Sequence, residues 1–252
     1  MLVQHDLRHM RSRHPDGQNR PMFKTLLALH IAGGSLALAS MWIPLVTRKG
    51  GRTHRRAGWV FVVGMTIVSV TAVGLACWRL LFDPRPEARN FAVFLLYIAL
   101  LSGSSVSAGV RVLRAKRRTG VHRHPWDVGL PFLLTASSAA IALFGIRTGQ
   151  PLFAAFSIIG LLNGITALRY WLRPPTSPMH WWFEHMSGML GGCIAALTAF
   201  LVVNTNTLGL MPLAAWLGPS IVLGPITAAW TQYYRRRFGQ AEGRRGLKSQ
   251  PA

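Results

Sequence analysis

Apolar residues fall into seven blocks of about 20 residues, and charged residues are confined to the stretches between the blocks. A helix that rises 1.5 Å per residue needs about 20 residues to cross roughly 30 Å of hydrocarbon. The pattern therefore predicts an all-α fold, a polytopic integral membrane bundle of about seven transmembrane helices. The expected spans are residues 23–46, 58–81, 90–112, 127–146, 151–171, 181–203 and 212–234.

A polar tail lies at each end of the predicted seven-helix domain, which covers residues 22–235. Residues 1–21 are basic and contain the helix breakers Pro15 and Gly17, so we expect a disordered N-terminal tail. Met22 directly precedes the first apolar block and is a second candidate start, which leaves open whether the tail belongs to the mature protein. Residues 236–252 form a basic tail that we expect to be cytoplasmic.

Charge indicates how the chain is threaded. Only 14% of the residues are charged, against roughly 25% in a soluble domain, yet the net charge is +21. Nineteen basic residues lie in alternate connections, namely 47–57, 111–126, 169–180 and the tail from Arg235. Because basic loops stay in the cytoplasm, the N-terminus is predicted outside and the C-terminus inside, in a bacterial inner membrane. Basic residues in short loops favour the lipid bilayer, and no nucleic acid, as the partner.

The basic N-terminal tail is the exception, because this topology places it outside. An alternative interpretation makes it the start of a signal peptide, with the first block as its apolar region and a cleavage site at Ala37-Leu38-Ala39. Cleavage would remove His30, and an uncleaved segment would place loop 47–57 outside. The seven-span topology is the favoured interpretation.

No catalytic signature is present. The two cysteines, Cys77 and Cys193, lie inside apolar blocks and suggest neither a metal site nor a disulfide. The chain has no glycine-rich phosphate loop and no Ser-His-Asp pattern. Whether the protein is an enzyme therefore stays open; if it is one, intramembrane histidines favour a membrane oxidoreductase.

The two ends of the chain carry the residues of a recurring pattern. In the first two spans these are His30, Gly34, Ser35, Ala37, Leu38, Lys49, Gly50, His54, Arg55 and Gly58. In the last two spans they are Trp182, His185, Met189, Gly191, residues 194–200, Trp216, Pro219 and Gly224, and Asp127 opens the fourth span. With these residues the chain resembles a family of bacterial membrane proteins known only as a domain of unknown function. The resemblance covers most of residues 26–232. It implies a polytopic fold of about seven helices and no particular activity.

His30 is the clearest ionisable residue inside a predicted span, about eight residues from its outer end. Gly33, Gly34 and Ala37 share its helix face. In one interpretation, a neutral His30 hydrogen-bonds a neighbouring helix and the glycines allow close packing. In the other, His30 binds b-type haem or a metal and the glycines leave room for the macrocycle. The packing interpretation is favoured.

A second group of polar residues is expected at the cytoplasmic membrane face. Glu184 and His185 open the sixth span, and His54 and Arg55 precede the second. Glu184 and Asp127 are the only two acids at this boundary. These residues could form a site for an anionic ligand, a quinone-like head group, a haem propionate or a proton relay, or could be ordinary solvated residues.

The expected depths separate the histidines. Span 1 runs inward and span 6 runs outward, so His30 and His185 differ in depth by roughly 15 Å in ~30 Å of hydrocarbon. They are therefore not the axial pair of one haem, whereas His54 and His185 are predicted within about 10 Å of each other, given two imidazoles on one membrane face.

Three functions remain open at this point. The first is a membrane protein with a small polar site at the cytoplasmic face. The second is a redox protein that binds b-type haem or quinone, and the third is a transporter or channel for a small or anionic solute. The sequence does not identify the ligand, and whether the protein forms a homo-oligomer stays open.

Two pairs of glycines are predicted to form helix packing faces, Gly160/Gly164 and Gly188/Gly192. Asn163 is expected to add a hydrogen bond between helices.

Overall fold

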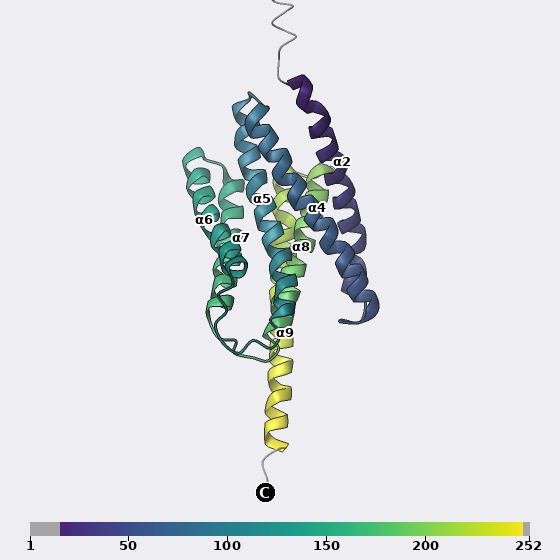
Figure 1. The fold of residues 1–252 in the computed structure, drawn as a ribbon, viewed down its shortest axis with the longest axis vertical. Coiled ribbons are helices and arrows are strands. Elements are labelled where there is room, and N and C mark those ends of the chain that lie inside the picture. Colours follow the sequence, from purple (N-terminus) through teal and green to yellow (C-terminus); the bar gives the residue numbers. More distant parts are fainter. Residues whose placement is uncertain (1–15, 249–252) are drawn as a thin grey trace, which may run out of the picture. The chain divides into compact units, whose positions relative to one another are not determined.

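The computed structural model describes residues 16–248, with side chains described for residues 21–238. Among these residues no strand occurs, and seven helices are long and apolar enough to cross a membrane. The prediction of an all-α, multi-pass membrane protein is therefore confirmed (Figure 1). The helices are α2 (Asp16–Ser40), α3 (Trp42–Val46), α4 (Arg52–Phe82), α5 (Pro86–Arg111), α6 (Pro125–Thr148), α7 (Pro151–Leu172), α8 (His180–Val203) and α9 (Pro212–Lys248).

The chain divides into two compact units, Met1–Gly103 and Ser104–Ala252, and each is described by itself. The helix α5 passes from one unit to the other at Gly103. A short 3-10 turn, η1 (Val112–Arg114), follows α5 in the second unit.

Two helices extend beyond the expected seven-helix domain of residues 22–235. The helix α2 begins at Asp16, within the predicted tail, whereas residues 1–15 lie outside the described residues. The helix α9 continues to Lys248, past the expected end at Tyr234. Hydrophobicity decides where a span ends but not where a helix ends, because arginines such as those at 235–237 are good helix formers.

In the first unit, α2 and α4 lie side by side and meet at two glycines (Figure 1). A Cβ atom added to Gly64 would lie 2.8 Å from the Gly33 carbonyl oxygen and 2.9 Å from the Ala37 nitrogen. A Cβ on Gly33 would lie 2.8 Å from Cγ2 of Ile67. The backbones thus approach to a distance that only glycine allows, which confirms the close packing predicted at Gly33. A Cβ on Gly34 would lie 3.7 Å from Cγ2 of Val68, an ordinary contact, so Gly34 is not required in the same way.

The connection between α2 and α4 is shaped by Pro44. Proline has no N–H to donate to the carbonyl four residues earlier, so α2 ends at Ser40 and the short α3 follows. Lys49 Nζ donates to the carbonyls of Pro44 and Leu45, each at 2.7 Å, and so stabilises the end of α3. Partial burial lowers the pKa of the Lys49 ammonium. Gly50 turns the chain towards α4 with a φ of 77°, a conformation that favours glycine.

The connection from α4 to α5 carries an ion pair at the surface. Arg85 Nη2 lies 2.8 Å from Asp83 Oδ2, and the Arg85 side chain is 73% exposed. Hydrogen bonds from Arg85 lower the pKa of the Asp83 carboxyl to about 2.

In the second unit, α6 and α7 form an antiparallel helical hairpin (Figure 1). Gly149 ends α6 in the left-handed conformation, with a φ of 65°, and Pro151 begins α7. A Cβ on Gly164 of α7 would lie 3.1 Å from the Pro131 carbonyl oxygen of α6. The predicted packing face at Gly164 is therefore confirmed.

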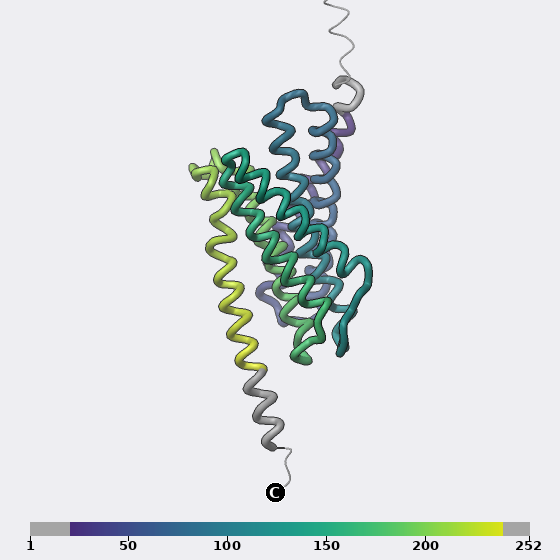
Figure 2. Tube along the Cα trace, turned by 90° about the vertical axis from the view of Figure 1, so that its left-hand side faces the viewer, coloured from purple at the N-terminus to yellow at the C-terminus, as the bar shows by residue number. Residues whose placement is uncertain are grey.

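The remaining contacts in the second unit involve α8. A Cβ on Gly188 would lie 2.6 Å from the Ser105 carbonyl oxygen and 2.7 Å from the Gly109 nitrogen, so α8 crosses the end of α5 at backbone contact. This confirms the packing face predicted at Gly188. On its other side α8 packs along the long helix α9, with the Trp182 and Tyr234 ring centroids 5.1 Å apart (Figure 2).

Candidate functional site

His30 forms a hydrogen bond between the two helices of the first unit. Its Nδ1 atom lies 3.0 Å from Thr71 Oγ1, and the Thr71 hydroxyl donates to the Ile67 carbonyl at 2.6 Å. Because the Thr71 proton is engaged there, Thr71 accepts from His30 and the proton of the imidazole lies on Nδ1. The bond confirms that His30 hydrogen-bonds a neighbouring helix.

His54 and Arg55 lie in the first turn of α4, also in the first unit. His54 Nδ1 donates to the Pro44 carbonyl at 3.2 Å, next to the Lys49 contacts. Arg55 is exposed. Of these two predicted site residues, His54 therefore supports the turn that precedes α4.

Glu184 and His185 lie in the second unit, near the start of α8. His185 Nδ1 donates to the Gly109 carbonyl at 2.7 Å, beside the crossing of α8 with α5. Since His54 and His185 belong to different units, the distance predicted between them stays a prediction, as does the comparison of His185 with His30. Within the first unit, His30 contacts Thr71, which lies 17 positions along α4 from His54.

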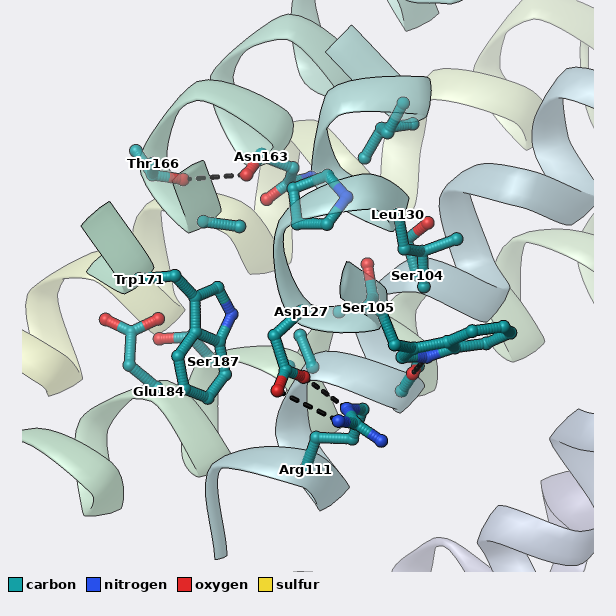
Figure 3. Close-up of a pocket in the computed structure, with 18 residues that line it drawn as sticks. Ser104, Ser105, Arg111, Asp127, Leu130, Asn163, Thr166, Trp171, Glu184 and Ser187 are labelled. Atoms are coloured by element: carbon teal, nitrogen blue, oxygen red, sulfur yellow. Dashed lines mark hydrogen bonds and ion pairs between the residues drawn. The ribbon is translucent and has the colours of Figure 1, made fainter. Parts of the chain in front are cut away.

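A cavity of about 110 Å³ lies within the second unit, among the ends of four helices (Figure 3). Residues 104–111 of α5, the first turns of α6 and α8, and the last turns of α7 line it. Both acids expected at the cytoplasmic boundary, Asp127 and Glu184, lie on its wall. Its other polar lining residues include Ser104, Ser105, Ser107, Arg111, Asn163, Thr166 and Ser187.

Asp127 is neutralised within the cavity wall. Its side chain is 5% exposed and forms an ion pair with Arg111, whose Nε contacts Oδ1 and whose Nη2 donates to Oδ2 at 2.9 Å. His122 Nε2 lies 2.8 Å from Oδ2, and His124 Nδ1 lies 3.8 Å away. The two hydrogen bonds between Arg111 and Asp127 appear as dashed lines in Figure 3.

The local sequence explains how Asp127 reaches this position. His124 caps α6 by accepting a hydrogen bond from the Trp126 amide at 3.3 Å, and Pro125 occupies the first turn. Asp127 then lies in the first turn, where the helix dipole favours an anion. The preceding loop is fixed by Arg118, which donates to the carbonyls of Gly120, Tyr170, Trp171 and Arg173.

Glu184 differs from Asp127 in having no hydrogen bond or ion pair to any described residue; Figure 3 shows no dashed line to it. The charges of Arg118 and Arg235 act on it from outside ion-pair distance. Arg118 is engaged with the carbonyls at the end of α7, and the Arg235 guanidinium lies 5.1 Å from the centre of the Phe183 ring. The cavity thus contains one carboxylate without a direct counter-charge.

Two further lining residues, Ser104 and Trp171, affect what the cavity can bind. Ser104 is only 7% exposed, and its hydroxyl oxygen is buried without a hydrogen-bond partner in the described structure. Trp171 is buried as well, and lies between the two carboxylates in the view of Figure 3. At the rim, Trp126 Nε1 donates to Ser107 Oγ at 3.2 Å.

Neither Ser104 nor Trp171 stood out as a site residue in the sequence, and Arg111 stood out only as one of the basic residues of the connection 111–126. The concentration of serines at 102–107, in a span that ends near Arg111 and opposite Asp127, was the available signal.

Because the comparisons with known proteins found no match, the function is inferred from the described residues of the site. No protein-family model matches the chain, no curated protein matches it, and no solved structure matches it. Within residues 16–248, no group of three His, Cys, Asp or Glu side chains could hold a metal ion.

Proposed function

We propose that the protein binds a small polar solute in the cavity of the second unit and carries it across the membrane. The observation that supports this proposal is Glu184, a carboxylate on the cavity wall with no direct partner among the described residues. An ionisable residue inside a spanning helix is costly, and such residues commonly mark substrate or ion pathways.

The cavity also meets the other requirements of a solute site. It is built from four spanning helices, has both charged and hydroxyl-bearing walls, and offers room for several water molecules or one small ligand. Exposed Asn163, Thr166 and Ser187 lie among its lining residues, so the cavity has a polar rim.

We place the protein in a bacterial inner membrane, with the cavity near the cytoplasmic face. The basic connections at 111–126 and 169–180 flank the helix ends that line the cavity, and basic loops favour the cytoplasm. The same charge distribution makes the lipid bilayer, and no nucleic acid, the expected partner. We also propose that the chain belongs to the bacterial family of unknown function that its sequence resembles.

Cysteine labelling tests the topology. In a variant whose native cysteines Cys77 and Cys193 are replaced by alanine, Thr53→Cys and Thr119→Cys are expected to react with a membrane-impermeant maleimide only after permeabilisation. Thr207→Cys, in the connection without basic residues, should react in intact cells and serves as the control. Labelling of Thr53→Cys or Thr119→Cys in intact cells would contradict the orientation.

Flux measurements test solute transport itself. Proteoliposomes that contain the protein are expected to take up at least one of three radiolabelled probes, methylammonium, acetamide or acetate, faster than protein-free vesicles. Gly191→Trp should abolish the uptake, because Gly191 lines the cavity and an indole would fill about its whole volume. Gly218→Trp is the control, since nothing lies within 4 Å of a Cβ at Gly218. Equal leakage with and without the protein, for all three probes, would refute the proposal.

A further inference from the structure

We infer that the solute is a small primary ammonium ion, of the size of methylammonium or ethylammonium. This inference rests on the proposed function and adds the chemical class of the ligand. It is carried by three lining residues of the cavity: the carboxylate of Glu184, the hydroxyl of Ser104 and the indole of Trp171.

The charge balance of the cavity favours a cation. Arg111 and Asp127 neutralise each other, so they add no net charge to the wall. When ionised, Glu184 contributes one negative charge, and the arginines that act on it from a distance are held by the Tyr170 carbonyl and the Phe183 ring. A carboxylate in such surroundings is stabilised by a bound cation that donates hydrogen bonds to it. An anionic solute would face this carboxylate without a free cation to bind.

Ser104 favours a ligand that can form a hydrogen bond, and the Glu184 carboxylate on the same cavity wall, which only accepts when ionised, makes N–H donors the matching groups. Its buried hydroxyl has no partner among the described residues, and an unpaired buried hydroxyl is unfavourable. A hydroxyl oxygen can accept from an ammonium N–H, which offers three donors. A quaternary ammonium ion has no N–H and would leave Ser104 unpaired.

Trp171 favours an organic cation over an inorganic one. The buried indole lines the same cavity as Glu184 and gives the alkyl group of an organic cation an apolar wall. Its ring already faces the Arg118 guanidinium, whose central carbon lies 5.4 Å from the ring centre. Within the described residues no three ligating side chains come together, so the dehydration of a metal ion would not be balanced by coordination. The volume of about 110 Å³ limits the ligand to a few heavy atoms.

The test is binding of methylammonium chloride to the purified full-length protein in detergent, followed by thermal shift and isothermal titration. Sodium chloride, tetramethylammonium chloride, acetamide and potassium acetate are the comparison solutes, all at constant ionic strength. We expect saturable stabilisation by methylammonium and none by the other four.

Variants separate the contributions of the two polar residues. Glu184→Gln keeps the shape of the side chain and is expected to weaken methylammonium binding about tenfold or more, because a charge-assisted hydrogen bond is lost. Ser104→Ala should weaken it about threefold. Glu87→Gln, which changes an exposed acid at the start of α5, should bind like the parent.

The outcomes are distinct. Equal binding of sodium, or parental affinity in Glu184→Gln, overturns the ammonium assignment. If acetamide or acetate binds instead, and Gly191→Trp abolishes that binding, the assignment fails while the proposed solute site stands. If none of the solutes binds, both fail. The comparison of solutes uses the unmodified protein, so it decides the matter even if a variant does not fold.

Discussion

Replacing Gly188 by leucine is expected to lower the free energy of unfolding in detergent by more than about 3 kcal/mol. Overpacking in a core typically costs 1–3 kcal/mol because side chains shift to make room. At Gly188 the neighbours are backbone atoms of Ser105 and Gly109, 2.6 and 2.7 Å from an added Cβ. Backbone cannot move aside without separating α8 from α5, so the loss exceeds the usual range.

Gly129→Leu is the matched control for this measurement. Gly129 lies in α6, and nothing lies within 4 Å of a Cβ added there. Unfolding by graded addition of a denaturing detergent, followed by tryptophan fluorescence, should give a parental midpoint for Gly129→Leu and a much lower one for Gly188→Leu. Identical midpoints for the two variants would show that the crossing at Gly188 is looser than described.

The ion pair of Arg111 and Asp127 provides the second large effect. Arg111→Leu leaves the Asp127 carboxylate, which is 5% exposed, without its main partner. Breaking a buried pair costs 3–5 kcal/mol. We expect a loss of about 3 kcal/mol, at the low end of that range, because the Arg111 side chain is 22% exposed and His122 remains bound to Asp127.

The double variant Arg111→Leu/Asp127→Leu distinguishes the charge from the packing. Removing both partners leaves no isolated charge, so most of the stability lost in Arg111→Leu should return. Asp83→Asn should change stability very little, because asparagine keeps the shape of the Asp83 side chain, which is 10% exposed, and the lost charge interaction is with Arg85, which is 73% exposed to water. A double variant as unstable as Arg111→Leu would mean that Arg111 acts through packing alone.

The spans were predictable because the bilayer imposes a simple rule on sequence. About 20 apolar residues per helix and breakers such as Pro125 and Pro151 mark the helix boundaries, and the structure places helix starts at both prolines. The beginning of α2 and the end of α9 were not predictable in this way. A helix can continue into polar sequence, and hydrophobicity says nothing about where it stops.

The candidate site was predictable only in part. Glu184 and Asp127 stood out because acids are rare at the ends of the spans, and both line the cavity. That Asp127 is paired and Glu184 is not depends on which loop approaches which helix end. Arg111 is 16 residues from its partner, and Ser104 becomes notable only because its hydroxyl is buried without a partner in the described structure. Such facts are set by packing, which periodicity does not encode.

The short separation of Arg111 and Asp127 has a consequence for biosynthesis. Only 16 positions separate the two partners, so they leave the ribosome shortly after one another and well before Glu184. The carboxylate can therefore enter the bilayer already neutralised by the arginine that precedes it. Glu184 follows 57 positions later, when the other walls of the cavity have been made. Insertion of α8 is thus the step at which an uncompensated charge must be accommodated by the translocation machinery.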